Sequence, residues 1–233
     1  ATLGGVALLQ ESATASQEAG AGRGWEQSYS GAKSAAASDA TLPPGLPGTH
    51  YKPVVTPNGT ALRWTLVDGV KVFHLIAEEV DHEFAPGLKA KCWGYKGSVH
   101  GPTIEAVEGD RVRIYVTNRL SAPTTAHWHG VFLPNGMDGV GGLTQAAIKP
   151  GETFVYEWTF RQHGTFMYHS HHDEMTQMAM GMMGLFIIHP KGGDTVDRDY
   201  ALILHNFALH PGTRRPDPAV MQDFDLWTFN SKV

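Results

Sequence analysis

The chain has 233 residues, of which 42% are hydrophobic and 18% are charged, so it is long enough for one sizeable domain with extra segments or for two small ones. Its formal net charge of −5 gives no reason to expect nucleic acid or an anionic membrane surface as a partner, and no apolar run approaches the length of a membrane span. A single cysteine, Cys92, excludes an internal disulfide framework.

The first 48 residues have the composition of a leader followed by a linker. Residues 1–9 (ATLGGVALL) are short, small and apolar, and an A-x-A pattern follows at residues 13–15, as at the end of a secretory signal peptide. A disordered, alanine-rich N-terminus is the alternative. Residues 10–48 are rich in Ala, Gly and Ser and lack periodic apolar positions. We therefore expect residues 1–48 to be mostly irregular and the protein to be exported, to the periplasm or outside the cell.

From about residue 60 the sequence is typical of a β-protein. Gly, Pro and Asn turn signals separate short apolar or alternating runs, and no long helical pattern is present. The runs lie at residues 62–67, 70–76, 112–117, 153–160 and 184–189. Such a pattern predicts an all-β fold, an antiparallel β-sandwich, which we place at residues 49–190. A further strand is expected at residues 200–205, and residues 191–233 are interpreted as a linker and the incomplete beginning of a second domain, or as a tail packed on the first.

Two His-x-His units carry the strongest chemical signal. His127 and His129 flank a tryptophan, and His169 and His171 flank a serine. Residues i and i+2 of a strand project from the same face, so four imidazoles converge if the two strands are neighbours. Imidazole suits copper, zinc, iron and nickel, and four neutral histidines without a thiolate fit Cu(II) or Zn(II). The alternative is a set of surface or core histidines without a metal.

The residues around these units have ordinary structural interpretations. Trp128 is expected to pack on the opposite face of its strand, and Cys92 to be a small packing residue. A group of methionines follows the second unit; we favour packing for it, although thioethers also suit Cu(I). Its members are Met175, Met178, Met180, Met182 and Met183. Residues 172–174 read as a solvated loop. The histidines without partner spacing are treated as structural: His74, His82, His100, His163, His189, His205 and His210.

The histidine units belong to a longer series of motifs. In chain order these are GPTI at 101–104, GD at 109–110, HWHG at 127–130, MDG at 137–139, PG at 150–151, GTFMYHSH at 164–171 and GxxG at 181–184. Their order and spacing resemble the N-terminal domain of multicopper oxidases (laccases, copper efflux oxidases, ascorbate oxidase), over roughly residues 64–190. The resemblance implies a cupredoxin-like Greek-key β-sandwich. It also implies an exported oxidoreductase that couples oxidation of phenols, aromatic amines or metal ions to reduction of dioxygen to water.

The resemblance further implies roles for individual residues. Family members hold a type 2 copper and a type 3 pair with four His-x-His units. By position, His127 would bind the type 2 copper, His129 and His169 would share one type 3 copper, and His171 would bind the other. Asp138 matches an acidic residue near this cluster, where a carboxylate orients bound water or supplies protons. An ordinary turn aspartate is the alternative for Asp138.

The same resemblance shows what the 233 residues lack. The family's type 1 copper needs a cysteine within a His-Cys-His unit, and Cys92 lies between Lys91 and Trp93. The chain therefore supplies half of the trinuclear ligands and no type 1 site, and we expect it to be inactive alone. The expected partners are a small-molecule or metal-ion substrate, dioxygen, and either missing C-terminal domains or further copies of the chain. Two rival functions stay open at this point, a non-catalytic copper-binding or copper-resistance protein and a structural zinc site.

Overall fold

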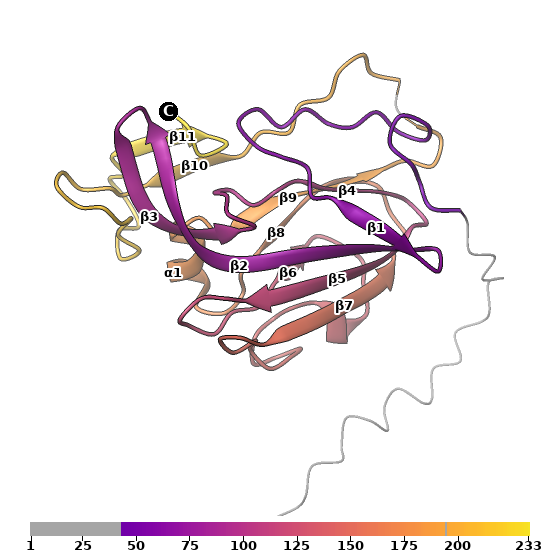
Figure 1. Cartoon of the computed structure of the whole chain (residues 1–233), viewed down its shortest axis with the longest axis horizontal. Coiled ribbons are helices and arrows are strands. Elements are labelled where there is room, and N and C mark those ends of the chain that lie inside the picture. The colour runs from indigo at the N-terminus through magenta and orange to yellow at the C-terminus, as the bar shows by residue number, and fades with distance from the viewer. Residues whose placement is uncertain (1–42, 194) are drawn as a thin grey trace, which may run out of the picture. The chain divides into compact units, whose positions relative to one another are not determined.

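The computed structural model describes residues 43–193 and 195–233, within a compact unit that spans Thr41–Val233. The signal-like segment and most of the irregular leader expected at residues 1–48 lie outside the described residues. No helix among the described residues is long and apolar enough to cross a membrane. Strands dominate this part of the chain (Figure 1), so the prediction of an all-β fold is confirmed.

The first sheet is built around one long strand. Its members are β1 (Trp64–Val67), β2 (Val70–Ala85), β3 (Leu88–Tyr95), β5 (Arg111–Asn118) and β7 (Thr153–Thr159). The order is β1-β2-β5-β7, and β3 also pairs with β2. The first half of β2 pairs with β5, and its second half extends beyond the end of β5 and pairs with β3. Sequence analysis predicted only the first seven residues of β2, because the second half carries several charged residues.

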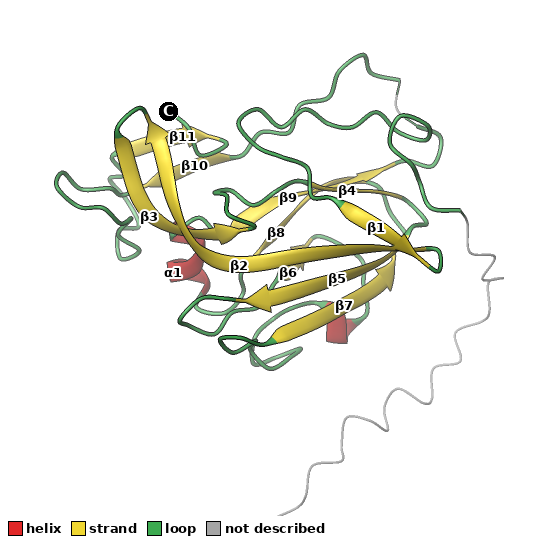
Figure 2. Ribbon diagram, viewed as in Figure 1, coloured by secondary structure: helices red, strands yellow, loops and turns green. Residues whose placement is uncertain are grey.

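The second sheet carries both histidine units. It contains β4 (Ile104–Val107), β6 (His127–His129), β8 (Gly164–His169) and β9 (Met183–His189), in the order β4-β9-β8-β6. A 3-10 turn, η1 (Asn135–Met137), follows β6, and a short helix, α1 (Glu174–Ala179), connects β8 to β9. Figure 2 shows these two pieces as the helical elements of an otherwise stranded fold.

Two of the strand pairings are parallel, so the antiparallel pairing predicted for the sandwich holds only in part. β2 pairs in parallel with β5, and β4 pairs in parallel with β9. The chain visits β4 of the other sheet between β2 and β5, and it visits strands of both sheets between β4 and β9, so each parallel pair is joined by a crossover and not by a hairpin. The alternation of apolar and polar residues within a strand does not show whether its neighbour in the sheet runs parallel or antiparallel.

The main core lies between the two sheets. In β5, Val112, Ile114 and Val116 are fully buried at alternate positions, as the pleat of a strand requires. From the other sheet, Trp128 packs edge-on against Tyr156 and Phe186 with its side chain 0% exposed. The prediction that Trp128 faces away from the flanking histidines is confirmed, and the buried indole fixes which face of β6 points into the core.

A smaller hairpin packs on the far end of β2 and β3. β10 (Leu204–Phe207) and β11 (Leu226–Phe229) form an antiparallel pair, so the strand expected at residues 200–205 lies slightly later in the chain. Phe207 joins Phe84 and Cys92 in a separate apolar cluster. Burial raises the pKa of the Cys92 thiol to about 12, which keeps it protonated and inert. The packing role predicted for Cys92 is confirmed.

A buried ion pair ties the entry segment to the first sheet. Lys71 Nζ lies 2.6 Å from Asp110 Oδ2, and both side chains are almost fully buried. The Asp110 carboxylate also accepts backbone N–H bonds from Gly45 (2.7 Å) and Val107 (2.8 Å). Because one carboxylate serves three donors, the segment before β1 is held against the start of β5.

Candidate metal centre

The register of β6 and β8 brings the two histidine units together. His127 lies directly opposite His169 in this antiparallel pair, and His129 lies opposite Met167. The ring centroids of His127 and His129 are 5.5 Å apart, and those of His127 and His169 are 5.2 Å apart. The four imidazoles were expected to converge only if the strands that carry them were neighbours, and β6 and β8 are neighbours.

His171 lies just beyond the end of β8 and turns toward the same group. Its ring centroid is 5.2 Å from that of His127 and 6.0 Å from that of His169. Among the described residues, ligand atoms of His127, His129 and His169 all lie within 4.8 Å of one another, and His171 is not part of this tighter set. The structure therefore gathers all four predicted histidines, three of them closely.

Hydrogen bonds to backbone carbonyls orient two of the rings for metal binding. The Nδ1 atom of His127 lies 2.7 Å from the carbonyl oxygen of Asp138, and that of His169 lies 2.8 Å from the carbonyl oxygen of Ser170. A carbonyl oxygen only accepts, so each Nδ1 carries the proton and each Nε2 keeps a free lone pair. Metal-binding histidines in proteins are held by the same kind of bond.

The donor set fits copper. Nδ1 of His129 and Nε2 of His169 are 3.2 Å apart, whereas two nitrogens that bind one ion at about 2.0–2.1 Å from it must lie about 3 Å apart. Burial lowers the pKa of His169, and this outweighs the opposing effect of its hydrogen bond to Ser170 and of Glu174. The imidazole thus stays neutral to lower pH, as a ligand must. Imidazoles alone do not separate copper from zinc.

Asp138 contacts the centre mainly through its backbone. Its carbonyl oxygen orients His127, while its carboxylate Oδ1 lies 3.4 Å from the same Nδ1 atom. The side chain is 32% exposed. It follows η1 and precedes Gly139, which lies against the backbone of Ala126 and His127. The carboxylate is therefore beside the centre and open to solvent.

Sequence reasoning missed two residues of α1. Glu174 places its carboxylate oxygens 3.7 Å from His169 Nδ1 and 3.6 Å from His171 Nε2. Gln177 is the buried residue of the helix and bonds to Ser170. The interpretation of residue 174 as part of a solvated loop is wrong, because a helix begins there and turns it toward the histidines. The i, i+3 spacing of His171 and Glu174 was the available signal.

The remaining candidates are structural. Met180 and Met182 are fully buried in the main core, as predicted for packing residues, whereas Met175 is 60% exposed. His189 bonds to Glu105 at 2.9 Å, and His82 bonds to the carbonyl oxygen of Ser231 at 2.7 Å. These histidines have fixed partners away from the centre.

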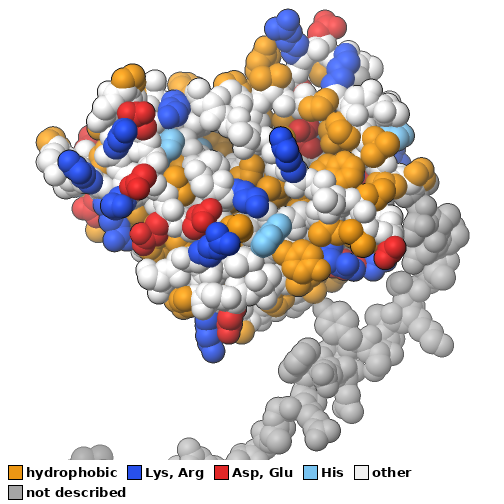
Figure 3. Space-filling model, in the orientation of Figure 1, with side chains coloured by type: hydrophobic (Ala, Val, Ile, Leu, Met, Phe, Trp, Pro, Cys, Tyr) orange, Lys and Arg blue, Asp and Glu red, His pale blue; other side chains and the backbone are white. Residues whose placement is uncertain are grey.

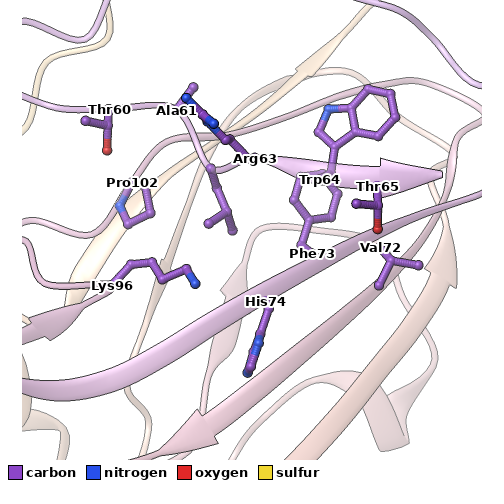
Figure 4. Close-up of a pocket in the computed structure, with 11 residues that line it drawn as sticks. Thr60, Ala61, Arg63, Trp64, Thr65, Val72, Phe73, His74, Lys96 and Pro102 are labelled. Carbon is purple, nitrogen blue, oxygen red and sulfur yellow. The ribbon is translucent and has the colours of Figure 1, made fainter.

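A cleft of about 510 Å³ lies elsewhere, between the segment at residues 60–65 and β2 (Figure 4). Its basic lining residues are Arg63, His74 and Lys96, and none of the four converging histidines lines it. On the face of the molecule shown in Figure 3, basic and acidic side chains are interspersed with apolar ones. The metal centre is therefore distinct from this cleft.

Comparison with known proteins identifies the family. A model of the multicopper oxidase family matches residues 77–193, half of the 233-residue chain. The chain belongs to the multicopper oxidase family. Copper is accordingly the cofactor that membership of this family implies.

Individual curated proteins are also similar in sequence to this chain. Copper resistance protein A of Pseudomonas syringae pv. tomato is 42% identical over 105 residues, which cover 45% of this chain and 17% of that protein. Dihydrogeodin oxidase of Aspergillus terreus is 43% identical over 109 residues, covering 45% of this chain and 18% of that protein. The chain thus spans less than a fifth of the length of these curated relatives.

Solved structures of multicopper oxidases share the fold. The multi-copper oxidase from Pseudomonas Thermotolerans aligns with a TM-score of 0.67 and 30% identity, covering 70% of this chain and 42% of that one. The blue copper oxidase from Nitrosomonas europaea aligns with a TM-score of 0.62 and 33% identity, covering 69% and 53% respectively. The prediction of a cupredoxin-like sandwich is confirmed by these neighbours.

Proposed function

We propose that the chain is the first cupredoxin domain of a copper-dependent oxidase and contributes half of the ligands of its trinuclear copper cluster. The observation that carries this proposal is the convergence of His127, His129, His169 and His171 on one face of the second sheet. The complete protein would couple oxidation of phenols, aromatic amines or metal ions to reduction of dioxygen. Relatives named as oxidases favour this function over a non-catalytic copper-binding protein.

The ligands divide between copper ions in the way the family resemblance implies. His127 binds the type 2 copper, His129 and His169 share a type 3 copper, and His171 binds the second type 3 copper. The 3.2 Å approach of His129 and His169 supports a shared ion.

The chain's own residues hold and orient the ligands. Copper held by these histidines would supply the redox chemistry that dioxygen reduction needs. The carbonyls of Asp138 and Ser170 fix the rings of His127 and His169, and Trp128 excludes water from behind β6. The solvent-accessible Asp138 carboxylate orients water or supplies protons near His127.

A metal titration of this chain tests the proposal. We expect Cu(II) to bind in preference to Zn(II), with nitrogen ligands visible in the electron paramagnetic resonance (EPR) spectrum, and His127→Ala to lower copper occupancy. His163→Ala is the matched control, because His163 is 58% exposed and bonds to Glu108 outside the centre. Tighter binding of zinc than copper, or unchanged copper binding by His127→Ala, would contradict the proposal.

The proposal also assigns the remaining parts of the chain. Residues 1–48 form a signal remnant and linker, 49–190 the first cupredoxin domain, and 191–233 a linker and the start of a second. The protein is exported. A His-Cys-His unit is expected in the coding sequence after Val233, or in a partner chain, to complete the type 1 site. A purified complete protein without such a unit, or without oxidase activity, would contradict this assignment.

A further inference from the structure

Gln177 lies in the protein interior, and both the oxygen and the nitrogen of its side-chain amide are hydrogen-bonded. Its Oε1 atom accepts hydrogen bonds from the hydroxyls of Ser170 (2.5 Å) and Thr124 (2.7 Å), and its Nε2 atom donates to the carbonyl of Pro123 (2.7 Å). Gln177 is 1% exposed, and both hydroxyl-bearing residues are 0% exposed. Since the Pro123 carbonyl only accepts, the amide nitrogen must face it, which fixes the orientation of the amide.

Ser170 connects this amide to the histidines. It stands between His169 and His171, and its carbonyl oxygen receives the Nδ1–H bond that orients His169. Its backbone N–H donates to the carbonyl of Met182 at 3.2 Å. The backbone N–H of His171 donates to the hydroxyl of Thr125 at 3.3 Å. The peptide between the two histidines is thus held from one side by hydroxyls and an amide that form a single buried network.

We propose that Gln177 is a positioning residue of the metal centre: by holding Ser170 it sets the ring orientation of His169 and the backbone position of His171. The inference rests on the proposed copper function of these histidines but not on how they divide between ions. The Ser170 hydroxyl also lies 3.2 Å from the carbonyl oxygen of His172, and the Thr124 hydroxyl lies 3.3 Å from its neighbour's carbonyl oxygen. Loss of Oε1 therefore turns both hydroxyls toward these longer contacts. The carbonyl of Ser170 then moves relative to His169.

Two substitutions separate this role from packing. Gln177→Met keeps the approximate volume and removes both ends of the amide. Gln177→Glu keeps an acceptor for Ser170 and Thr124, but its buried carboxyl bonds the Pro123 carbonyl only when it is protonated. We expect Gln177→Met to weaken Cu(II) binding by roughly tenfold or more, the usual effect of removing a partner that orients a metal ligand. Gln177→Glu should recover part of the loss.

Asn230→Leu is the matched control. Asn230 is also buried, and its amide makes three hydrogen bonds, to the backbone of Pro57, Ala201 and Ile203, outside the Ser170 network. It should lower the melting temperature as Gln177→Met does, yet leave the affinity for Cu(II) and the EPR spectrum unchanged.

The measurements are Cu(II) titration with EPR, together with ¹⁵N NMR of the imidazoles in the metal-free protein. A wild-type chain that takes up no Cu(II) would overturn the proposed function. A Gln177→Met protein with wild-type affinity, EPR spectrum and His169 imidazole signals would overturn the positioning role while leaving the proposed function intact. Changed His169 signals in the metal-free variant support the positioning role independently of copper. If Gln177→Met fails to fold, Ser170→Ala removes the hydroxyl that Gln177 holds. Changed His169 signals in that variant support the positioning role, and wild-type signals overturn it.

Discussion

His129 Nδ1 and His169 Nε2 approach to 3.2 Å across two paired strands, although 40 positions separate them in the chain. This contact gives a test of the shared copper ion. His129→Ala and His169→Ala should each weaken Cu(II) binding by more than the roughly 10–100-fold that follows loss of a ligand's orienting partner.

Because both substitutions remove the same ion, the double variant should lose little beyond either single one. Isothermal titration of the four proteins with Cu(II) measures the coupling. Additive losses in binding free energy would show that the two histidines serve different ions.

Gly139 and Gly142 offer a matched pair beside the centre. Both have a positive φ, +79° and +81°, so alanine at either position incurs roughly 1–2 kcal/mol of backbone strain. A Cβ on Gly139 would lie 1.8 Å from the carbonyl oxygen of Ala126, whereas one on Gly142 would meet open space. Gly139→Ala should therefore displace the Asp138 carbonyl from His127 and weaken Cu(II) binding, and Gly142→Ala should not. Equal Cu(II) affinities for the two variants would rule out this effect.

Asp138→Asn separates the two contacts that Asp138 makes. The backbone carbonyl orients His127 and survives the substitution, so Cu(II) affinity should change by less than about threefold. In the complete oxidase the missing carboxylate should slow dioxygen reduction, by roughly 10²-fold if it transfers protons. Oxygen consumption at saturating reductant measures this. An unchanged rate of oxygen consumption would show that Asp138 is an ordinary turn aspartate without a role in proton transfer.

The buried ion pair of Lys71 and Asp110 should be costly to break. Lys71→Met leaves the Asp110 carboxylate without its cation in the interior, which typically destabilises a protein by about 3–5 kcal/mol. Lys91→Met removes the exposed partner of Asp81, where the expected loss is about 0–1 kcal/mol. Urea unfolding measures both. Similar losses for the two variants would mean that burial adds nothing to the Lys71 pair.

The pair of His100 and His205 predicts a loss of stability in acid. Their Nε2 and Nδ1 atoms are 2.9 Å apart. Burial, followed by the proximity of His205 and His82, holds the pKa of His100 well below the ordinary value, and burial lowers that of His205 from 6.5 to about 4. The unfolded chain therefore binds more protons than the folded one below pH 6.5. Stability is complete above that pH and declines as the pH falls toward 4.

Unfolding by urea at several pH values tests this window. His205→Phe should flatten the decline, because the apolar ring removes one of the two titrating groups beside Phe207. His163→Phe, at an exposed position, should leave it unchanged. If the free energy of unfolding of His205→Phe fell as steeply with pH, other groups would cause the acid sensitivity.

The histidine site was predictable because its information is local. A period of two in a strand places His127 and His129 on one face and Trp128 on the other, whatever the rest of the fold does. Motif order then supplied the family and with it the sandwich. Cys92 and the methionines at 180 and 182 followed from the same reasoning, since small or soft apolar side chains near strands pack in cores.

The parts that were missed depend on contacts between distant segments. The parallel pairing of β2 with β5 is decided by the path through the opposite sheet. Helix α1 has only six residues, too few for an apolar period, so neither Glu174 nor Gln177 stood out. A buried glutamine has no sequence signature, because two of its three partners, Pro123 and Thr124, lie more than fifty positions away.

The indole of Trp128 acts as a lock on the register of β6. A slip of β6 by one residue would expose the indole and drive two imidazoles into an apolar layer formed by Tyr156 and Phe186. Such a slip is penalised whether or not metal is present. The folded core therefore fixes the face that His127 and His129 share, and a chain without metal would still present both rings on the same side of β6.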